Sequence, residues 1–405
     1  MSKGRTSSEQ GLPVDERMFM NAEEAAAELG VTVETLYSYV SRKKIRTKRV
    51  DGTRKRLYWR ADVSRARRGG AKARPDADIA QTDITLVTAE GPYYRGRNAI
   101  ELSETLTLEQ TAALLWQVDE DSIFTSTLPS APPGLEALSK VLDDAVSTDK
   151  AIALLPFLEQ ANPRAFDLSP SGMSRTGADV LRWYAAILTD ADRPSAAPMH
   201  EQIADRVSAS HDVADLIRRM LVLSADHGFG AGTFAVRAVA STGVSPYRSV
   251  VAGLAITAGR RSRLGRSESL WRFMSEVADS NDPAKIVIQR LRDGETVPGF
   301  DSPAAYEMAD PRAEALIGAV ERVYGDHPTF RKVMTAATAV KDAFDLSPSF
   351  ALANMLTTTL SGLPHNRVLY VLGRCAGWIA HSIEQYQIGE MVSPQAIYRG
   401  ALPND

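Results

Sequence analysis

Cysteine is almost absent from this chain: Cys375 is the single one among 405 residues. One cysteine excludes an internal disulfide and a zinc site built from cysteines. Long hydrophobic runs are absent too, since none approaches the roughly 18 residues of a membrane-spanning helix. The opening residues, MSKGRTSSEQ, lack the apolar segment of a signal peptide. We therefore expect a cytoplasmic protein in which Cys375, within an apolar segment, serves packing.

Strand-like alternation of apolar and polar residues is also scarce. From Leu135 to Met220 the pattern is helical, and it breaks at turns that contain proline. No internal repeat or low-complexity run is visible. The length is sufficient for two or three domains and a large core. These features predict a mainly α protein.

The net charge of -3 hides a strongly basic block. Between Arg42 and Arg74 there are 15 lysines and arginines and only two aspartates, a net charge of +13, so the rest of the chain carries -16. Such a concentration of positive charge near one end is typical of a segment that contacts nucleic acid or another polyanion.

Two short helices are predicted at the start of this region. Asn21 and Glu24 form a capping box that opens the first helix, and Gly30 ends it. Thr32 caps the second helix. Asp51-Gly52 then lies between two basic runs, a pattern typical of a two-residue hairpin turn.

This order of helix, turn, helix and basic hairpin resembles the winged helix-turn-helix domains of the excisionase and MerR-like group. We expect a disordered tail over residues 1–17, this domain over 18–70 and a linker over 71–80. The resemblance implies binding to double-stranded DNA through the second helix and the hairpin. The alternative is a solvated basic face or a domain kept for protein contacts. The expected DNA-binding residues are Thr35, Tyr37, Ser38, Arg42, Lys43, Arg54, Lys55 and Arg56.

The stretch from Leu221 to Gly243 stands out in the remainder. An apolar helical face precedes it and reaches the pair Asp226-His227, which a glycine-rich turn follows. The glycines do not fit a dinucleotide-binding fingerprint, because Thr233 stands where the third glycine would be. This pattern has two interpretations. The helix end brings polar groups close to a ligand, or it is a corner between two helices in which the histidine is structural.

The same stretch resembles citrate synthase, and other motifs agree with it. They include Tyr94-Arg95-Gly96, the helix end Leu114-Leu115-Trp116 and the segment GRCAGWIAHSIEQ. The resemblance covers roughly residues 81–400. It implies the citrate synthase fold, with a large helical domain over 81–261 and 346–405 and a small helical domain over 262–345.

In citrate synthase the methyl carbon of acetyl-CoA joins the ketone of oxaloacetate, and arginines hold the carboxylates. The resemblance implies that His227, Arg312 and Arg374 bind oxaloacetate or citrate. The alternative for the two arginines is surface ion pairing. A structural role is favoured for His381. The resemblance gives no metal site and no bound cofactor; acetyl-CoA enters only as a possible substrate.

The catalytic positions of the family depart from its pattern together. Ser262 and Ser302 stand at the two histidine positions, and Ser349 or Ala351 stands at the aspartate position. Ser393 replaces an arginine that reaches the neighbouring subunit in family dimers. Serine at neutral pH cannot replace a carboxylate base or match imidazole as an electrophile. No catalytic residue is therefore assigned.

Three functions remain open. The first is a nearly silent citrate synthase subunit that pairs with an intact paralogue and regulates or supports it. The second is a DNA-binding regulator that uses the citrate synthase-like body to dimerise and to sense a ligand. The third, an ordinary homomeric enzyme, is disfavoured by the three lost positions.

Overall fold

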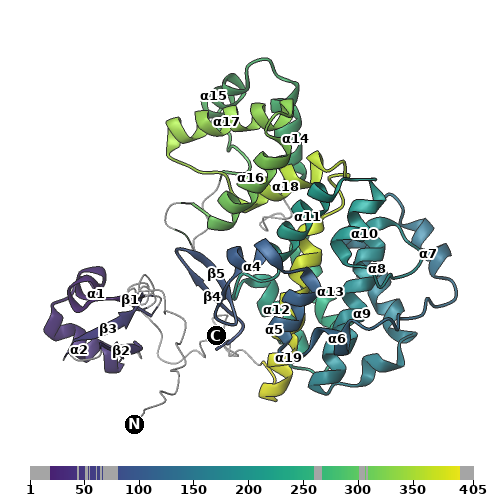
Figure 1. Ribbon diagram of the computed structural model, residues 1–405, viewed down its shortest axis with the longest axis horizontal. Helices are drawn as coiled ribbons and strands as arrows, with labels where there is room; N and C mark the ends of the chain where they lie inside the picture. Colours follow the sequence, from purple (N-terminus) through teal and green to yellow (C-terminus); the bar gives the residue numbers. More distant parts are fainter. Residues whose placement is uncertain are drawn as a thin grey trace, which may run out of the picture. The chain divides into compact units, whose positions relative to one another are not determined.

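The chain divides at residue 81 into an N-terminal unit and a larger body (Figure 1). The computed structural model describes residues 19–42, 45–50, 53, 55–60, 62–63, 66, 81–259, 267–300, 306 and 309–392. The predicted tail and linker lie outside the described residues, as do Lys43, Arg54, Ser262, Ser302 and Ser393.

In the N-terminal unit a helix pair packs on a small antiparallel sheet. The Asn21–Glu24 capping box and the left-handed Gly30 are present at the two ends of α1, as predicted. The strand order is β1-β3-β2, with Thr47 opposite Tyr58 in the register of β2 and β3. The elements are β1 Phe19–Met20, α1 Ala22–Leu29, α2 Val33–Arg42, β2 Thr47–Arg49 and β3 Arg56–Trp59. Their core contains Met20, Leu36, Tyr58 and Val63.

The body opens with a three-stranded antiparallel sheet of order β4-β5-β6 and is otherwise helical, as expected for a mainly α protein. Its first part comprises β4 Thr85–Thr88, β5 Gly91–Tyr94, β6 Arg97–Asn98, α4 Ala99–Thr105, α5 Leu108–Trp116, α6 Glu120–Ile123, α7 Leu135–Val141, α8 Ser147–Gln160, the 3-10 helix Pro163–Phe166, α9 Pro170–Thr189, α10 Met199–Arg206, α11 His211–Ser224, α12 Ala231–Ala240 and α13 Pro246–Thr257. The second part comprises α14 Ser267–Asp279, α15 Pro283–Arg292, α16 Pro311–Tyr324, α17 Pro328–Phe344, α18 Phe350–Leu360 and α19 Leu369–Ile388. Within the described residues, no helix is long and apolar enough to cross a membrane.

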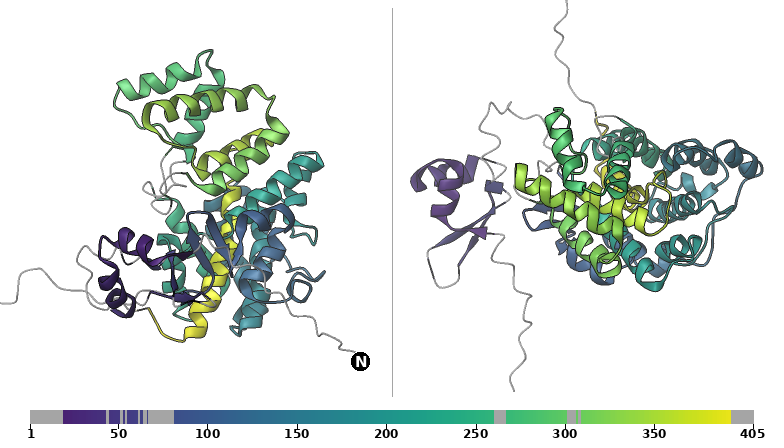
Figure 2. Two further views of the ribbon diagram at one scale, coloured as in Figure 1. Left: turned by 60° about the vertical axis from the view of Figure 1, so that its left-hand side comes forward. Right: turned by 90° about the horizontal axis from the view of Figure 1, so that it is seen from above.

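Helix α19 is the axis of the body. It runs through the middle of the helical array and packs against α5, α9, α11, α12 and α13 (Figures 1 and 2). Cys375 is fully buried in this helix, so its predicted packing role agrees with its position. Gly373 and Gly377 face the end of α11, where a β-carbon would collide with the backbone oxygens of Leu221 and Ala225. The two glycines therefore let α19 approach the loop that follows α11.

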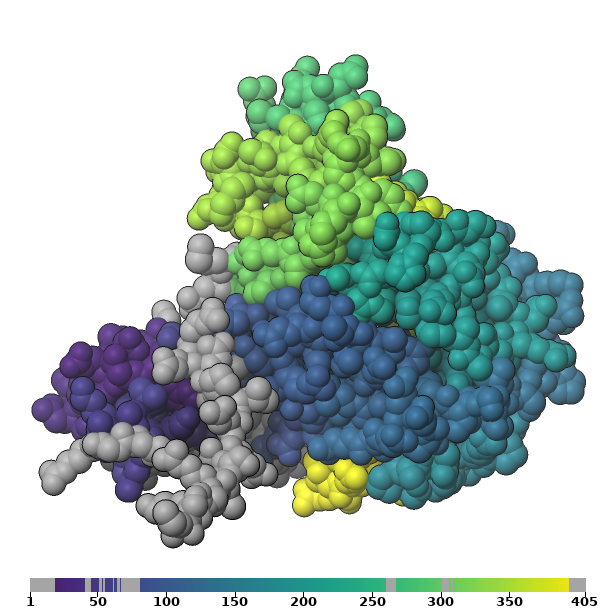
Figure 3. All heavy atoms as spheres, in the orientation of Figure 1, coloured from purple at the N-terminus to yellow at the C-terminus, as the bar shows by residue number. Residues whose placement is uncertain are grey.

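A second, smaller core forms a lobe at the top of the body in Figure 3. Helices α14, α15 and α17 supply most of it, and Leu352, Met355 and Leu356 of α18 complete it. The opposite side of α18 contributes Phe350 and Ala353 to the main core, and α16 packs entirely there. The packing thus joins the two lobes through α18. The large-domain and small-domain bounds within the body stay a prediction.

We expect Gly377→Ala to destabilise the body, because the added methyl group has to displace backbone atoms at the α11 end. Overpacking of this kind costs about 1–3 kcal/mol, more than alanine gains over glycine in a helix. Gly318→Ala is the control: it also lies inside a helix, and nothing lies within 4 Å of its added methyl group. Urea unfolding should show a lower midpoint for the first variant only. Equal midpoints would contradict this packing account.

Candidate functional site

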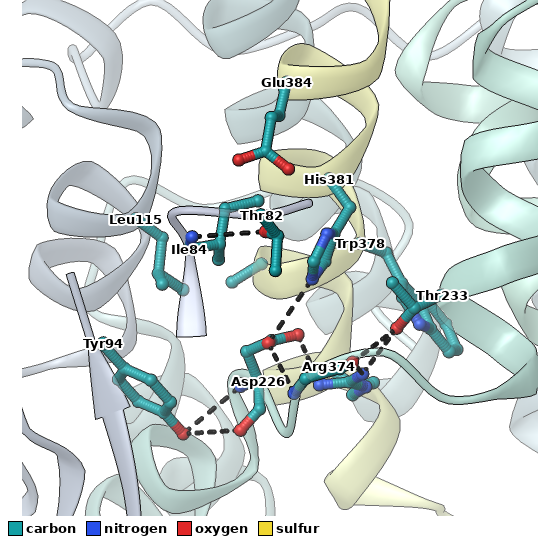
Figure 4. Close-up of polar contacts among 12 residues, drawn as sticks. Thr82, Ile84, Tyr94, Leu115, Asp226, Thr233, Arg374, Trp378, His381 and Glu384 are labelled. Carbon is teal, nitrogen blue, oxygen red and sulfur yellow. Dashed lines mark hydrogen bonds and ion pairs between the residues drawn. The ribbon is translucent and has the colours of Figure 1, made fainter. Parts of the chain in front are cut away.

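The loop between α11 and α12 holds Asp226 and His227, at the helix end that the sequence predicts. The Tyr94 hydroxyl donates to the Asp226 carbonyl at 3.1 Å and accepts from its amide nitrogen at 3.2 Å. Gly228 follows in the left-handed conformation, with φ of 68°. Strand β5 therefore fixes the backbone of this loop, and Figure 4 shows Tyr94 reaching it.

The carboxylate of Asp226 is fully buried and pairs with Arg374 of α19. Arg374 Nη1 donates to Asp226 Oδ1 at 2.5 Å, and His381 Nε2 lies 3.4 Å from Oδ2 (Figure 4). The Gly228 amide donates to the same carboxylate at 2.9 Å. Burial alone would raise the pKa of Asp226, but Arg374 and His381 outweigh it and hold the pKa well below its usual range. Asp226 is therefore a buried anion that orders the loop.

His381 connects this ion pair to a second buried cluster. Its Nδ1 lies 3.4 Å from Nη1 of Arg237, which also forms an ion pair with Glu384. Glu384 in turn accepts the backbone amide of Asp83 at 2.9 Å. His381 is fully buried between charged groups of opposite sign, which agrees with the structural role predicted for it.

Arg312 lies at the start of α16 and is also buried and paired. Its Nε and Nη2 donate to the two oxygens of Asp310 at 3.0 and 2.7 Å. Its guanidinium lies 4.3 Å from the centre of the Phe350 ring. Burial lowers the pKa of Arg312, but the bond and charge of Asp310 outweigh this and raise it. The ion pairs of Arg312 and Arg374 are thus internal, not on the surface.

A cavity opens beside Arg312 between α14, α18 and the start of α19. Its lining residues are Ser267, Leu270, Arg312, Phe350, Ala351, Asn354, Met355, Thr358, His365, Arg367, Val368, Leu369 and Tyr370. Two arginines and no carboxylate are among these described residues. Ala351 is in the wall, whereas Ser349 caps α18 through the backbone amide of Leu352. Neither candidate for the aspartate position supplies a base.

The three predicted substrate-binding residues lie around one region of the body. His227 Nε2 is 2.8 Å from the hydroxyl of Tyr306, and Tyr306 lies within electrostatic range of Arg312. Arg374 donates to the carbonyl of Gly228, next to His227, at 3.3 Å. It also lies one helical turn after Tyr370, which lines the cavity with Arg312. Their role in binding a substrate stays a prediction.

Five residues of the predicted DNA-binding set have described side chains, and all five are exposed in the N-terminal unit. Thr35, Tyr37 and Ser38 are exposed on α2, and the side chain of Tyr37 is 57% exposed. Lys55, which precedes β3, and Arg56, the first residue of β3, are exposed, and β3 pairs with the fully exposed β2. Arg42 ends α2. The winged helix-turn-helix and its DNA contacts remain predictions.

Comparison with solved structures defines the class of this body. It matches citrate synthase from Thermoplasma acidophilum, solved with carboxymethyl coenzyme A and oxaloacetate, with a TM-score of 0.68 at 18% identity over 82% of this chain and 96% of that one. Citrate synthase from Thermotoga maritima gives a TM-score of 0.67 at 22% identity over 81% and 95% of the two chains. The chain therefore has the citrate synthase fold.

The family description "Citrate synthase, C-terminal domain" matches residues 75–399. The chain belongs to the citrate synthase family. It is 30% identical to citrate synthase from Haloferax volcanii over 195 residues, which are 46% of this chain and 51% of that protein. It thus spans about half the length of this relative. A 2-methylcitrate synthase from Mycobacterium tuberculosis is 25% identical over 76% of this chain and 84% of its own length.

Several features of the site could not be predicted from the sequence. The sequence singles out Asp226 through the Asp-His pair. No local pattern predicts that its partner is Arg374, which lies 148 residues later. No pattern in the sequence predicts that Tyr306 contacts His227. Asn354 carries no local signal beyond its place three residues after Ala351. Long-range partners of this kind require the tertiary structure.

Asp226→Asn should destabilise the body by roughly 3–5 kcal/mol at pH 7, since it leaves the buried Arg374 guanidinium without its anion. Because the folded pKa of Asp226 lies below its unfolded value, its contribution is fully present above about pH 4. It is lost as the pH falls below that value, at up to about 1.4 kcal/mol per pH unit. The difference between wild type and variant should therefore narrow from pH 4 towards pH 2.

Urea unfolding across this pH range measures both effects. Asp326→Asn is the control, because Asp326 pairs with Arg331 in full exposure, and surface ion pairs contribute little. Equal stability of wild type and Asp226→Asn at pH 7 would show that the Asp226–Arg374 pair does not hold the loop.

Proposed function

We propose that this chain is a citrate synthase-family subunit that binds a dicarboxylate but does not catalyse the condensation at a useful rate by itself. In this proposal it regulates or supports a chain of the same family whose catalytic residues are intact. The observation that carries the proposal is the cavity beside Arg312, whose described lining contains arginines but no carboxylate.

The chemistry explains why this observation matters. Condensation of acetyl-CoA with oxaloacetate requires a base to remove a methyl proton and donors to stabilise the enolate and polarise the ketone. Ala351 offers no proton acceptor, and the hydroxyl of Ser349 accepts the backbone amide of Leu352 at 3.4 Å. Loss of a general base typically costs about 10²–10⁴-fold in rate.

Ligand binding has separate support. Arg312 lines the cavity, and Asp310 fixes the orientation of its guanidinium through two nitrogens. A guanidinium held in this way is suited to a second carboxylate, because its planar fork keeps a defined direction. Oxaloacetate or citrate would then be held near Arg312, His227 and Arg374.

Two exposed apolar side chains on neighbouring helices support the binding of a partner subunit. Phe234 on α12 is 48% exposed and Ile256 on α13 is 40% exposed. Helices α12 and α13 pack against each other. Exposed apolar side chains on adjoining helices are typical of a protein interface. The occupant in this proposal is an intact paralogue, or a second copy of this chain.

The second candidate function is a DNA-binding regulator with a ligand-sensing body. The observation that favours it is that the N-terminal unit carries exposed polar residues on α2 and an exposed basic strand, β2. Lysine and arginine neutralise phosphates, and exposed polar side chains on a helix can contact base edges. Binding to DNA is compatible with the subunit role.

The first test is thiol release from acetyl-CoA in the presence of oxaloacetate. We expect this chain alone to be at least about 100-fold slower than an intact family member. The assay is run on this chain, on a paralogue with intact catalytic residues, and on the two co-purified. Normal turnover by this chain alone would overturn the proposal. A paralogue that is fully active alone and does not co-purify would leave the DNA-binding regulator as the better account.

The second test concerns DNA. Replacing Arg49, Lys55 and Arg56 with alanine should lower the salt dependence of duplex binding by up to about 2–3 units, at ~0.9 per phosphate contact. The matched control replaces Lys140, Arg272 and Arg331, which are exposed in the body. Fluorescence anisotropy over a range of salt concentrations measures the slope. If the chain does not bind duplex DNA even at low salt, DNA binding is ruled out as its function.

A further inference from the structure

A second cavity in the body has a volume of about 410 Å³, which lies within the ~300–1,000 Å³ of small-molecule sites. Residues of α6, the loop after it, the 3-10 helix Pro163–Phe166 and α9 line it. It shares no lining residue with the cavity beside Arg312. Its described lining is mostly polar, with four charged residues and three hydroxyl residues. A ligand held here is therefore one that carries charge.

Asp179 of α9 presents an unpaired carboxylate oxygen to this cavity. The residue is 4% exposed, and its Oδ2 accepts a hydrogen bond from Asn162 Nδ2 at 2.9 Å. Its Oδ1 forms no hydrogen bond or ion pair with the described residues, and unlike the buried unpaired atoms of the chain it retains accessible surface. Because Asp179 lines the cavity, that surface belongs to the cavity wall.

The surroundings of Asp179 favour a cationic partner for Oδ1. Burial raises the pKa of Asp179, although the bond from Asn162 and the charges of Arg164 and Arg182 lower it. No arginine or lysine among the described residues forms an ion pair with this carboxylate. A buried carboxylate of this kind gains from a charged N–H donor, which replaces the water that burial removes.

Arg164 supplies a positive charge at the same cavity. It is exposed on the 3-10 helix and lines the cavity. Its bonds within the described part of the chain are made by its backbone, so its guanidinium is available to a ligand. The other lining arginine, Arg175, already pairs with Asp167 at 2.7 Å. The four charges of the lining sum to zero, and one of each sign is uncommitted.

Two residues outside the lining hold these groups in place. Asn162 donates to Asp179 and accepts the backbone amide of Arg164 at 3.1 Å, so it ties the anionic wall to the cationic one. Arg182 donates to the carbonyl of Thr125 at 2.7 Å and thereby fixes the loop after α6. A site whose groups are held before the ligand arrives loses less entropy on binding.

We propose that this cavity binds a zwitterionic α-amino acid with a small polar side chain. Asp179 Oδ1 accepts a hydrogen bond from the ammonium group, and the guanidinium of Arg164 donates to the carboxylate. The hydroxyl-bearing wall, to which Thr125 and Thr127 belong, accommodates the polar side chain. The inference does not depend on the proposed dicarboxylate site.

The two contacts differ in their expected strength. The ammonium group meets a buried carboxylate, and a hydrogen bond to a charged group in such a place corresponds to roughly a tenfold or larger difference in affinity. The carboxylate meets the exposed Arg164, and an exposed ion pair corresponds to about a two- to fivefold difference. A ligand without the ammonium group therefore loses more than a ligand without the carboxylate.

Isothermal titration of the full chain with L-serine, 3-hydroxypropionate and ethanolamine tests the inference. The second ligand is serine without its ammonium group, and the third is serine without its carboxylate. We expect L-serine to bind at least about tenfold more tightly than 3-hydroxypropionate and about two- to fivefold more tightly than ethanolamine.

Asp179→Asn removes the carboxylate with little change of shape. Its carbonyl oxygen can still accept from Asn162, which turns the amide N–H groups towards the cavity. We expect this variant to bind L-serine no more tightly than 3-hydroxypropionate. Asp121→Asn is the matched control, because Asp121 is an exposed aspartate of α6 that does not line the cavity; it should keep the wild-type preference.

Arg164→Met tests the other half of the site and should bring L-serine level with ethanolamine. Its control is Arg97→Met, because Arg97 is also exposed but lies outside the lining. Far-UV circular dichroism verifies that each variant is folded, and the exposed position of Arg164 keeps the test decisive if Asp179→Asn does not fold. No binding of L-serine by wild type, or binding no tighter than that of both analogues, overturns the inference. An unchanged preference in Arg164→Met and in folded Asp179→Asn also overturns it.

Discussion

The ion pair between Asp226 and Arg374 is the interaction on which the centre of the body depends. It joins the loop after α11 to the central helix α19, and both residues are buried. Two oppositely charged groups in a low-dielectric interior are stable only when their remaining donors and acceptors are also satisfied. Here Gly228, Thr233 and His381 satisfy them. The loop that carries His227 is thereby held in one conformation.

The same constraint limits what Arg374 can do for a ligand. Its guanidinium already contacts Asp226, Thr233 and the Gly228 carbonyl, so its main effect is to shape the loop beside His227. Arg312 differs because it lines the cavity while Asp310 orients it. The two arginines, which carry the same prediction in the sequence, thus have unequal access to a ligand. We therefore propose Arg312, rather than Arg374, as the main carboxylate-binding group of the proposed dicarboxylate site.

Local patterns were sufficient for much of the fold. The Asn21–Glu24 capping box, the Gly30 helix end and the mainly helical body follow from short-range rules that the chain obeys. The joining of the two lobes through α18 does not follow from such rules, because each side of α18 packs against helices that are distant in sequence. The pairing of Asp226 with Arg374 cannot be predicted locally for the same reason, because the two residues are 148 positions apart.

The central proposal is that the cavity beside Arg312 has, in its described lining, no base able to enolise acetyl-CoA. The most direct measurement is exchange of the acetyl methyl protons of acetyl-CoA in deuterated water, followed by NMR with this chain and succinate as a non-reacting dicarboxylate. The exchange measurement separates proton abstraction from the later formation of the carbon–carbon bond. The account predicts an exchange rate no faster than in buffer alone. Exchange that rises in proportion to the concentration of this chain would contradict it.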